Sequence, residues 1–168
     1  YGSVSRGYKT GGFNVQMISD LIRDKIMNSR PDANAPEANV KQAVMYQPEH
    51  SWNYELGVQN AFLDRRLRTS LTLFYMDIKG LQLTEFVASG AGRMLTNAGS
   101  STSKGVEFSA DMLFGGGFNG GVNYGFAHAT FNHFTQIETI DGKQVDVDYS
   151  GKFVPYAPQH TANVYLNY

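Results

Sequence analysis

The feature of this sequence that most constrains its fold is a strict alternation of apolar and polar residues over long runs. In the run from Lys104 to Phe114, one side is apolar and the other is small or polar: Val106, Phe108, Ala110 and Met112 against Gly105, Glu107, Ser109 and Asp111. Successive side chains of a β-strand point to opposite faces, so a period of two predicts a strand with one apolar face.

The same alternation predicts six strands and an all-β fold. The longer strands run for about 10 to 13 residues, whereas strands of soluble proteins are most often about 5–6 residues long. A tilted strand needs about 9–11 residues to cross a bilayer, so strand length favours a membrane barrel. The predicted strands are Tyr1–Tyr8, Asn53–Leu63, Leu67–Met76, Lys104–Phe114, Val122–Ala127 and Thr161–Tyr168.

Short and long connections alternate between these strands. Two are tight turns, Asp64–Arg66 and Gly115–Gly117, and three are long, namely Lys9–Ser51, Lys79–Ser103 and Phe131–Gln159. Compact soluble domains rarely hold loops beyond about 12–15 residues, whereas outer-membrane barrels combine short periplasmic turns with long extracellular loops. The pattern therefore predicts part of a large antiparallel transmembrane β-barrel. A soluble β-sandwich with three large insertions is the alternative.

Composition agrees with a β-rich chain and excludes several kinds of partner and site. Charged residues make up 17% of the 168 residues, aromatic residues 13%, and there are 18 glycines, which fits many turns and an aromatic surface. The net charge of −1 gives no reason to expect a nucleic-acid partner. Without cysteine there is neither a disulfide nor a thiolate metal site. No run of about 18 apolar residues encodes a membrane-spanning helix.

Two of the long connections carry local patterns. Leu81–Phe86 reads as an extension of the preceding strand above the membrane. The first connection is predicted to hold a helix that starts near Ser19 and ends before Pro31. Its apolar residues at helical spacing are Ile18, Leu21, Ile22 and Ile26.

Five segments resemble, in the same order, the barrel of TonB-dependent outer-membrane receptors. Two carry the longest motifs: Ser5–Asn14 includes Gly-Tyr-Lys-Thr-Gly-Gly-Phe-Asn, and Pro48–Gly57 reads Pro-Glu-His-Ser-Trp-Asn-Tyr-Glu-Leu-Gly. In a third, Gly80 stands where the family more often has Asp. The remaining segments are Phe74–Ile78, Asn97–Gly99 with Lys104–Glu107, and Pro155–Thr161.

This resemblance implies about six strands of a barrel of about 22 strands. Residues 1–168 are then a fragment of the barrel domain, with the plug domain, the TonB box and both true termini absent. The implied function is TonB-energised uptake of a scarce solute across the outer membrane of a Gram-negative bacterium. A ferric siderophore is expected first, then cobalamin, haem or an oligosaccharide. The implied partners are outer-membrane lipid, the plug, TonB and the extracellular solute, with neither enzyme activity nor a cofactor.

The two faces of the strands are expected to meet different surroundings. The apolar set is predicted to face lipid, the alternative being a protein core: Leu56, Val58, Val106, Phe108, Val122, Tyr124, Val164 and Leu166. Carboxylates on the lipid face are costly, so the polar set is predicted to line the lumen, where it bonds the plug or merely solvates the interior: Glu55, Gln59, Arg68, Glu107, Asp111 and Asn123. Aromatic residues near strand ends are predicted to form interfacial girdles, ordinary strand propensity being the alternative: Trp52, Tyr54, Phe62, Tyr165 and Tyr168.

Ligand contacts are expected on the long loops, although exposed loop aromatics are commoner than ligand sites. The candidates are Tyr8, Lys9, Phe13, Tyr46, Trp52, Phe86, Arg93, Phe131 and Phe134. No metal site is expected, since His128 and His133 are spaced to lie on opposite strand faces, and His50 and His160 are isolated. A passive porin and a soluble all-β binding module are the alternative functions; a plug domain upstream of Tyr1 would distinguish a receptor from a porin.

Overall fold

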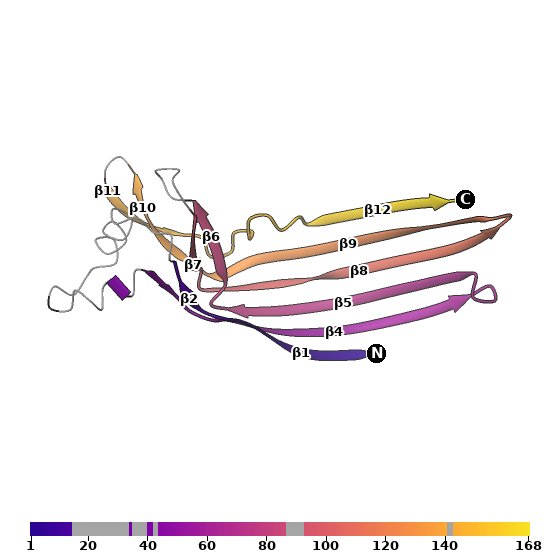
Figure 1. Cartoon of the computed structure of the whole chain (residues 1–168), viewed down its shortest axis with the longest axis horizontal. Helices are drawn as coiled ribbons and strands as arrows, with labels where there is room; N and C mark the ends of the chain where they lie inside the picture. Colours follow the sequence, from indigo (N-terminus) through magenta and orange to yellow (C-terminus); the bar gives the residue numbers. More distant parts are fainter. Residues whose placement is uncertain (15–33, 35–39, 42–43, 87–92, 141–142) are drawn as a thin grey trace.

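The computed structural model describes the chain except for residues 15–33, 35–39, 42–43, 87–92 and 141–142. Most of the described residues form one antiparallel sheet of six long strands (Figure 1). The all-β prediction is confirmed. In sheet order the strands are β1 (Gly2–Lys9), β4 (Glu49–Phe62), β5 (Leu67–Lys79), β8 (Ser100–Gly115), β9 (Phe118–His133) and β12 (His160–Asn167).

Three small hairpins lie at one end of this sheet, and the tight β4–β5 and β8–β9 turns lie at the other (Figure 1). This arrangement confirms the predicted alternation of long and short connections. The hairpins are β2 (Gly12–Phe13) with β3 (Met45–Tyr46), β6 (Gln82–Phe86) with β7 (Arg93–Asn97), and β10 (Thr135–Ile140) with β11 (Lys143–Asp148).

The segment Leu81–Phe86 does not extend β5 as predicted. Gly80 adopts a left-handed conformation with φ of 66°, which glycine reaches without steric cost, and its N–H donates to the Gly99 carbonyl over 2.7 Å. The chain leaves the large sheet there and enters the separate β6–β7 hairpin. The helix predicted around Ile18–Ile26 lies outside the described residues.

The two tight turns both need left-handed backbone conformations, and they reach them with different residues. Gly115, Gly116 and Gly117 have φ of 92°, 61° and 87°, values that glycine alone adopts readily. The β4–β5 turn instead places the non-glycine Leu63, Asp64 and Arg65 at φ of 54°, 54° and 69°. Such residues cost about 1–3 kcal/mol each and persist only where the surroundings hold them.

Arg66 holds the β4–β5 turn in this conformation, because it joins the turn to strand β8. Its N–H donates to the Leu63 carbonyl over 3.0 Å, and its carbonyl accepts from the Leu113 N–H over 2.8 Å. Its side-chain Nε donates to the Leu113 carbonyl over 3.2 Å. The turn therefore depends on the neighbouring strand as well as on its own sequence.

Four strands reach further toward the hairpins than the alternation predicted. Strand β4 starts at Glu49, β5 ends at Lys79, β8 starts at Ser100 and β9 ends at His133. The start of β8 is a run of Ser and Thr that has no apolar side, yet it pairs fully with β5. Backbone pairing therefore continues where the sequence pattern ends. No helix among the described residues is long and apolar enough to span a membrane.

In the described part of the chain, buried side chains are confined to the hairpin end. Among the described residues, Ala98 and Phe131 are the buried apolar side chains, and Gln82 and Ser101 are the buried polar ones. Large apolar residues in the middle of the sheet are exposed, as Val164 illustrates with 77% of its surface accessible. The sheet by itself therefore has no hydrophobic core on either face.

Candidate functional site

The register of the six strands separates their side chains into two unlike faces. Leu56 lies opposite Leu73, which lies opposite Val106, and the same parity continues across β9 and β12. We call this side the apolar face. All eight residues predicted to face lipid lie on it. Its large exposed residues include Val4, Tyr54, Leu56, Val58, Leu71, Leu73, Tyr75, Phe108, Tyr124, Val164 and Leu166.

The opposite side, which we call the polar face, carries all six residues predicted to line a lumen. Arg68 lies opposite Asp111, and Glu107 lies opposite Gly125. Small hydroxyl residues fill much of the rest, such as Ser70 opposite Ser109. The predicted set on this face is Glu55, Gln59, Arg68, Glu107, Asp111 and Asn123.

Tyr165 also lies on the polar face, so its predicted place in an aromatic girdle is wrong. It pairs with Gly121, which pairs with Asp111. Because Gly121 has no β-carbon, the Tyr165 ring lies against the strand there. Its hydroxyl donates to Asp111 Oδ1 over 2.5 Å. Alternation along β12 outweighs the position of the tyrosine near the strand end.

Two other aromatic rings cover glycines on the polar face in the same way. A β-carbon at Gly105 would lie 2.8 Å from the Phe74 ring, and one at Gly57 would lie 2.3 Å from the Tyr1 ring. Such pairs protect the exposed backbone at glycine and help to fix the register of the strands.

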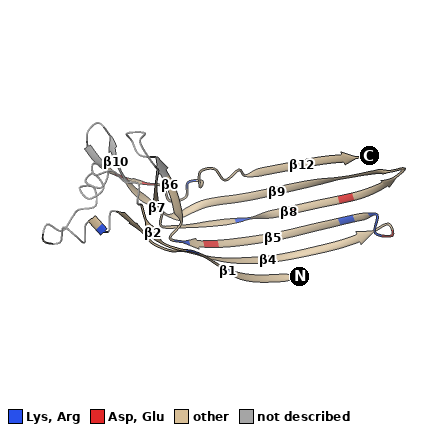
Figure 2. Cartoon of the chain, viewed as in Figure 1, with Lys and Arg blue, Asp and Glu red and all other residues tan. Residues whose placement is uncertain are grey.

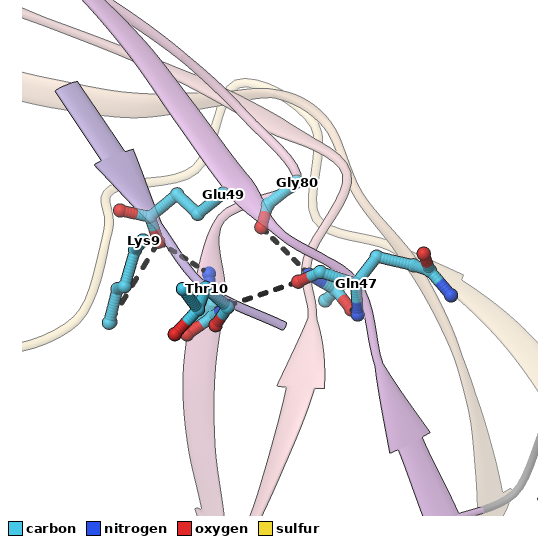
Figure 3. Close-up of polar contacts among 7 residues, drawn as sticks. Lys9, Thr10, Gln47, Glu49 and Gly80 are labelled. Carbon is cyan, nitrogen blue, oxygen red and sulfur yellow. Dashed lines mark hydrogen bonds and ion pairs between the residues drawn. The ribbon is translucent and has the colours of Figure 1, made fainter. Parts of the chain in front are cut away.

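At the hairpin end, hydrogen bonds and one ion pair connect seven residues that we call the loop-base cluster (Figure 3). Its members are Lys9, Thr10, Gln47, Glu49, Gly80, Gln82 and Asn97. They come from the ends of β1, β4, β5, β6 and β7 and from the segment that leads into β4. The cluster therefore joins the first and second long connections at their bases.

Gln82 is the buried centre of this cluster, with 7% of its surface accessible. Its side-chain Nε2 donates to the carbonyls of Thr10 and Gln47, both over 3.0 Å. Its backbone N–H donates to Glu49 Oε2 over 2.7 Å. A buried amide without partners would be costly, and these bonds compensate for removing Gln82 from water.

Asn97 binds the backbone of the first connection as a second strand would. Its Nδ2 donates to the Gln47 carbonyl over 3.0 Å, and its Oδ1 accepts from the Gln47 N–H over 2.7 Å. The same Nδ2 also donates to the Gly80 carbonyl over 2.8 Å. One side chain thus occupies three backbone groups on two segments.

Asn14 repeats this arrangement in the opposite direction. Its Nδ2 donates to the Leu95 carbonyl over 2.8 Å, and its Oδ1 accepts from the Leu95 N–H over 2.7 Å. Asn14 follows the first hairpin strand β2, whereas Leu95 lies in β7. The β2–β3 and β6–β7 hairpins are therefore tied together by an asparagine from each side.

The base of the third hairpin is held by aromatic packing. The rings of Phe131 and Phe134 lie 4.9 Å apart, and the Tyr149 ring lies 5.5 Å from that of Phe134. Hydrogen bonds from the side chain and backbone N–H of Ser150 hold the pKa of the exposed Asp148 carboxyl below its ordinary value. Phe131 is buried within this base, with 4% of its surface accessible.

The family profile described as "TonB dependent receptor-like, beta-barrel" matches residues 1–168. The chain belongs to the TonB-dependent receptor β-barrel family. This family is non-enzymatic and works in outer-membrane transport. The membership excludes a soluble binding module.

Two solved receptor structures are similar to this chain, and the first agrees with its fold. The ferric yersiniabactin uptake receptor FyuA from Yersinia pestis matches over 99% of the chain at 24% identity with a TM-score of 0.62. The ferripyoverdine receptor of the outer membrane of Pseudomonas aeruginosa matches over 75% at 20% identity with a TM-score of 0.49. The chain spans 20% of FyuA and 15% of the ferripyoverdine receptor.

The segments that resemble the TonB-dependent receptors supply most of the loop-base cluster. Lys9 and Thr10 come from the first segment, Glu49 from the second, and Asn97 from the fourth. Gly80 and Gln82 come from the stretch that continues the third, in which Gly80 stands where the family more often has Asp. The sequence offered these residues as signs of family and named only Lys9 among them as a candidate ligand contact. Their recurrence in the quoted segments was the signal that could have pointed to a shared site.

The apolar face has the dimensions of a membrane-spanning band. Over Trp52–Phe62 of β4, Val106–Phe114 of β8 and Phe118–Phe126 of β9, the register places no charged residue on this face. Charged residues are sparse along the six long strands as a whole (Figure 2). Ten residues cover about 33 Å at about 3.3 Å per residue. At a strand tilt of about 35–45°, this corresponds to a height close to the apolar band of about 25 Å in outer-membrane barrels.

Aromatic residues mark the two ends of this band, as predicted from the sequence for Trp52, Tyr54, Phe62 and Tyr168. Trp52 and Tyr54 lie toward the hairpins and are 43% and 45% accessible. At the turn end, the Phe118 and Tyr168 rings lie 4.5 Å apart. Aromatic rings of this kind are typical of the headgroup level of a bilayer.

Of the nine loop residues predicted as ligand contacts, those whose side chains the structure describes do not form one group. Tyr8 and Trp52 lie on the apolar face. Lys9 Nζ lies 4.0 Å from Glu49 Oε2 in the loop-base cluster. The buried Phe131 and the adjacent Phe134 support the base of the third hairpin.

The other four candidates lie on the first two hairpins. Phe13 is exposed on β2, and the Tyr46 ring of β3 lies against Gly12. Phe86 and Arg93 are paired in the β6–β7 hairpin, and their side chains lie outside the described part of the structure. No group of three or more His, Asp or Glu side chains that could hold a metal ion occurs within the described ranges.

Proposed function

We propose that the protein to which this chain belongs imports a scarce solute across the outer membrane with energy delivered by TonB, and that its cargo is a ferric siderophore. The observation that carries this proposal is a family match over residues 1–168 on a sheet with one apolar and one polar face. FyuA, which has a similar fold, carries ferric yersiniabactin in its name. Cobalamin, haem and oligosaccharides are the other solutes considered.

In this proposal, the polar face lines the lumen and contacts a plug domain contributed by the rest of the protein, which also supplies the TonB box. The carboxylates and amides on this face offer hydrogen-bond acceptors and donors to the plug. The residues proposed for this role are Glu55, Gln59, Arg68, Glu107, Asp111 and Asn123. The rule that long loops are extracellular supports hairpins that face the medium.

The proposed ligand contacts narrow to the residues of the first two hairpins. Phe13, Tyr46, Phe86 and Arg93 lie on β2, β3, β6 and β7, which the loop-base cluster ties together. Aromatic rings with a cation suit a ferric siderophore or a sugar. Tyr8 and Trp52 are better placed to meet lipid, and Phe131 to support its loop.

Growth of a strain that lacks the whole gene tests this function. On media with one iron source each, we expect growth to fail on a single ferric siderophore and to recover with the intact gene. Recovery should require TonB, so a second strain without TonB should fail in the same way. Uptake that persists without TonB would favour a passive porin and overturn the proposal. A defect on one carbon source alone would point to an oligosaccharide.

A further inference from the structure

Basic side chains on the apolar face gather at its hairpin end. We call this group the outer basic belt: Arg6, His50, Lys79, Lys104, His128 and His160. In the six strands of the large sheet, the apolar face carries three lysine or arginine residues against one carboxylate, Asp77. The polar face carries Lys9 and Arg68 against four carboxylates. The two faces therefore differ in the sign of their charge.

From β4 to β12 the belt runs diagonally across the strands, as a belt at one membrane depth must, whereas Arg6 of β1 lies opposite Trp52, further along the strands than His50. The pairings across β9, β8 and β5 place His160 of β12 level with Leu56 of β4. Leu56 lies about six residues, or about 20 Å, along β4 from His50, and β12 lies four strand spacings, or about 19 Å, across the sheet from β4. The resulting slope of about 45° matches the tilt of about 35–45° in outer-membrane barrels.

Most of the basic groups in the belt lie against aromatic rings. The Arg6 guanidinium lies 5.8 Å from the centre of the Trp52 ring, and the Tyr8 and His50 rings lie 5.1 Å apart. Stacking of this kind orients a cation while leaving its other side accessible. His128 lies 5.2 Å from Phe153, and His160 lies 5.1 Å from Phe126 and bonds the Tyr124 hydroxyl over 2.8 Å.

The position of the belt along the strands determines which part of the membrane surrounds it. It follows the uncharged band on the side of the long loops, which in outer-membrane barrels is the extracellular side. Lys and Arg at this level extend their charges into the headgroup region while their alkyl stems cover apolar surface. The headgroups of the outer leaflet belong to a glycolipid that carries phosphate. The cations therefore meet groups of opposite charge.

We propose that the outer basic belt binds the phosphate groups of the outer-leaflet glycolipid and holds this lipid against β1, β5 and β8. Arg6, Lys79 and Lys104 are exposed and supply the charge. The stacked histidines and aromatic rings flank them. Asp77 lies between these cations and weakens the attraction. This site is independent of the solute that the receptor carries.

Lipid binding by the complete receptor tests the proposal. The receptor is placed in phosphatidylcholine nanodiscs that contain either bisphosphorylated lipid A or lipid A from which both phosphates have been removed. We expect native mass spectrometry to show bound lipid A and at least ten-fold weaker binding of the phosphate-free form. Equal binding of the two lipids would overturn the proposal, and this comparison needs no variant.

Variants then assign the binding to the belt. We expect R6Q/K79Q/K104Q to lose at least one bound lipid A per receptor, with about five-fold weaker binding for each cation removed. The matched control Arg65→Gln removes an exposed cation from the β4–β5 turn at the other end of the sheet and should leave lipid A binding unchanged. Asp77→Asn should strengthen binding. If R6Q/K79Q/K104Q does not fold, Lys104→Gln alone carries the test, and unchanged binding in the folded variants contradicts the assignment.

Discussion

At the scale of single residues, two asparagine side chains bond backbone N–H and C=O groups in the way that a neighbouring strand does. A backbone N–H and C=O pair needs two partners, and a side-chain amide has the same donor and acceptor at similar spacing. Asn97 takes this role toward Gln47, and Asn14 takes it toward Leu95. Each pairing joins segments far apart in the sequence, so two short hairpins that would be marginal alone support one another.

Replacing Asn97 with alanine should loosen the base of the first connection. Three hydrogen bonds are lost, and each contributes about 0.5–1.5 kcal/mol. We expect the Gln47 amide, which donates to Asn97 Oδ1, to exchange its hydrogen at least ten-fold faster. Asn97→Asp is the control, because it keeps the acceptor for Gln47 but places a carboxylate against two carbonyls. If Gln47 exchanges unchanged in Asn97→Ala, the asparagine does not hold the loop.

Gly105 and Gly125 should differ in how well they tolerate replacement by alanine. A β-carbon at Gly105 would lie 1.9 Å from the Phe126 backbone oxygen, whereas one at Gly125 would meet a movable atom, Thr161 Oγ1, at 2.7 Å. We expect Gly105→Ala to destabilise the barrel by about 1–3 kcal/mol and Gly125→Ala to have little effect. The midpoint of urea unfolding in lipid vesicles measures both, and equal midpoints would contradict the steric argument.

At the scale of strands, alternation predicted which face each side chain takes, and it succeeded where a strand continues without a bulge. It placed Glu107 and Asp111 on one face and Val106 and Phe108 on the other. It failed at strand ends, because Ser100 begins a run without an apolar side.

The loop-base cluster was beyond sequence reasoning for a different reason. Its bonds connect Gln82 to Thr10 and Gln47, which are distant in the sequence, so no local period records them. Gln82 also reads as an ordinary strand residue until the fold buries it. In the sequence, the cluster residues were marked only by their place in the segments that resemble the family, and these segments did not indicate what the residues bind.

Neighbouring residues of β8 should respond differently to replacement by arginine. Ala110 lies on the apolar face and Ser109 on the polar face, near the same depth. An arginine on the lipid face near the midplane costs about 2–4 kcal/mol, so Ala110→Arg should lower the stability of the folded barrel by about that amount. Ser109→Arg should be nearly neutral. Urea-dependent folding into vesicles measures this difference, and equal losses would place both faces in the same surroundings.

At the scale of the whole molecule, the sheet is open at both sides. Strand β1 pairs only with β4 among the described strands, and β12 pairs only with β9. Each outer strand leaves a row of backbone N–H and C=O groups unpaired, and lipid offers no hydrogen bonds to satisfy them. Closing a barrel removes such edges, whereas an open edge invites pairing with another chain.

Residues 1–168 expressed alone should therefore fail to form a soluble monomer. Two open edges and a face that exposes Leu56, Val58 and Leu166 favour association, because soluble proteins rarely expose large continuous apolar patches. We expect sedimenting aggregates in buffer without detergent and partial rescue by a mild detergent that covers the apolar face. Analytical ultracentrifugation and circular dichroism distinguish these states. A monomer with native strand content in plain buffer would mean that the apolar face is covered by this chain itself, and the assignment of that face to lipid would then be lost.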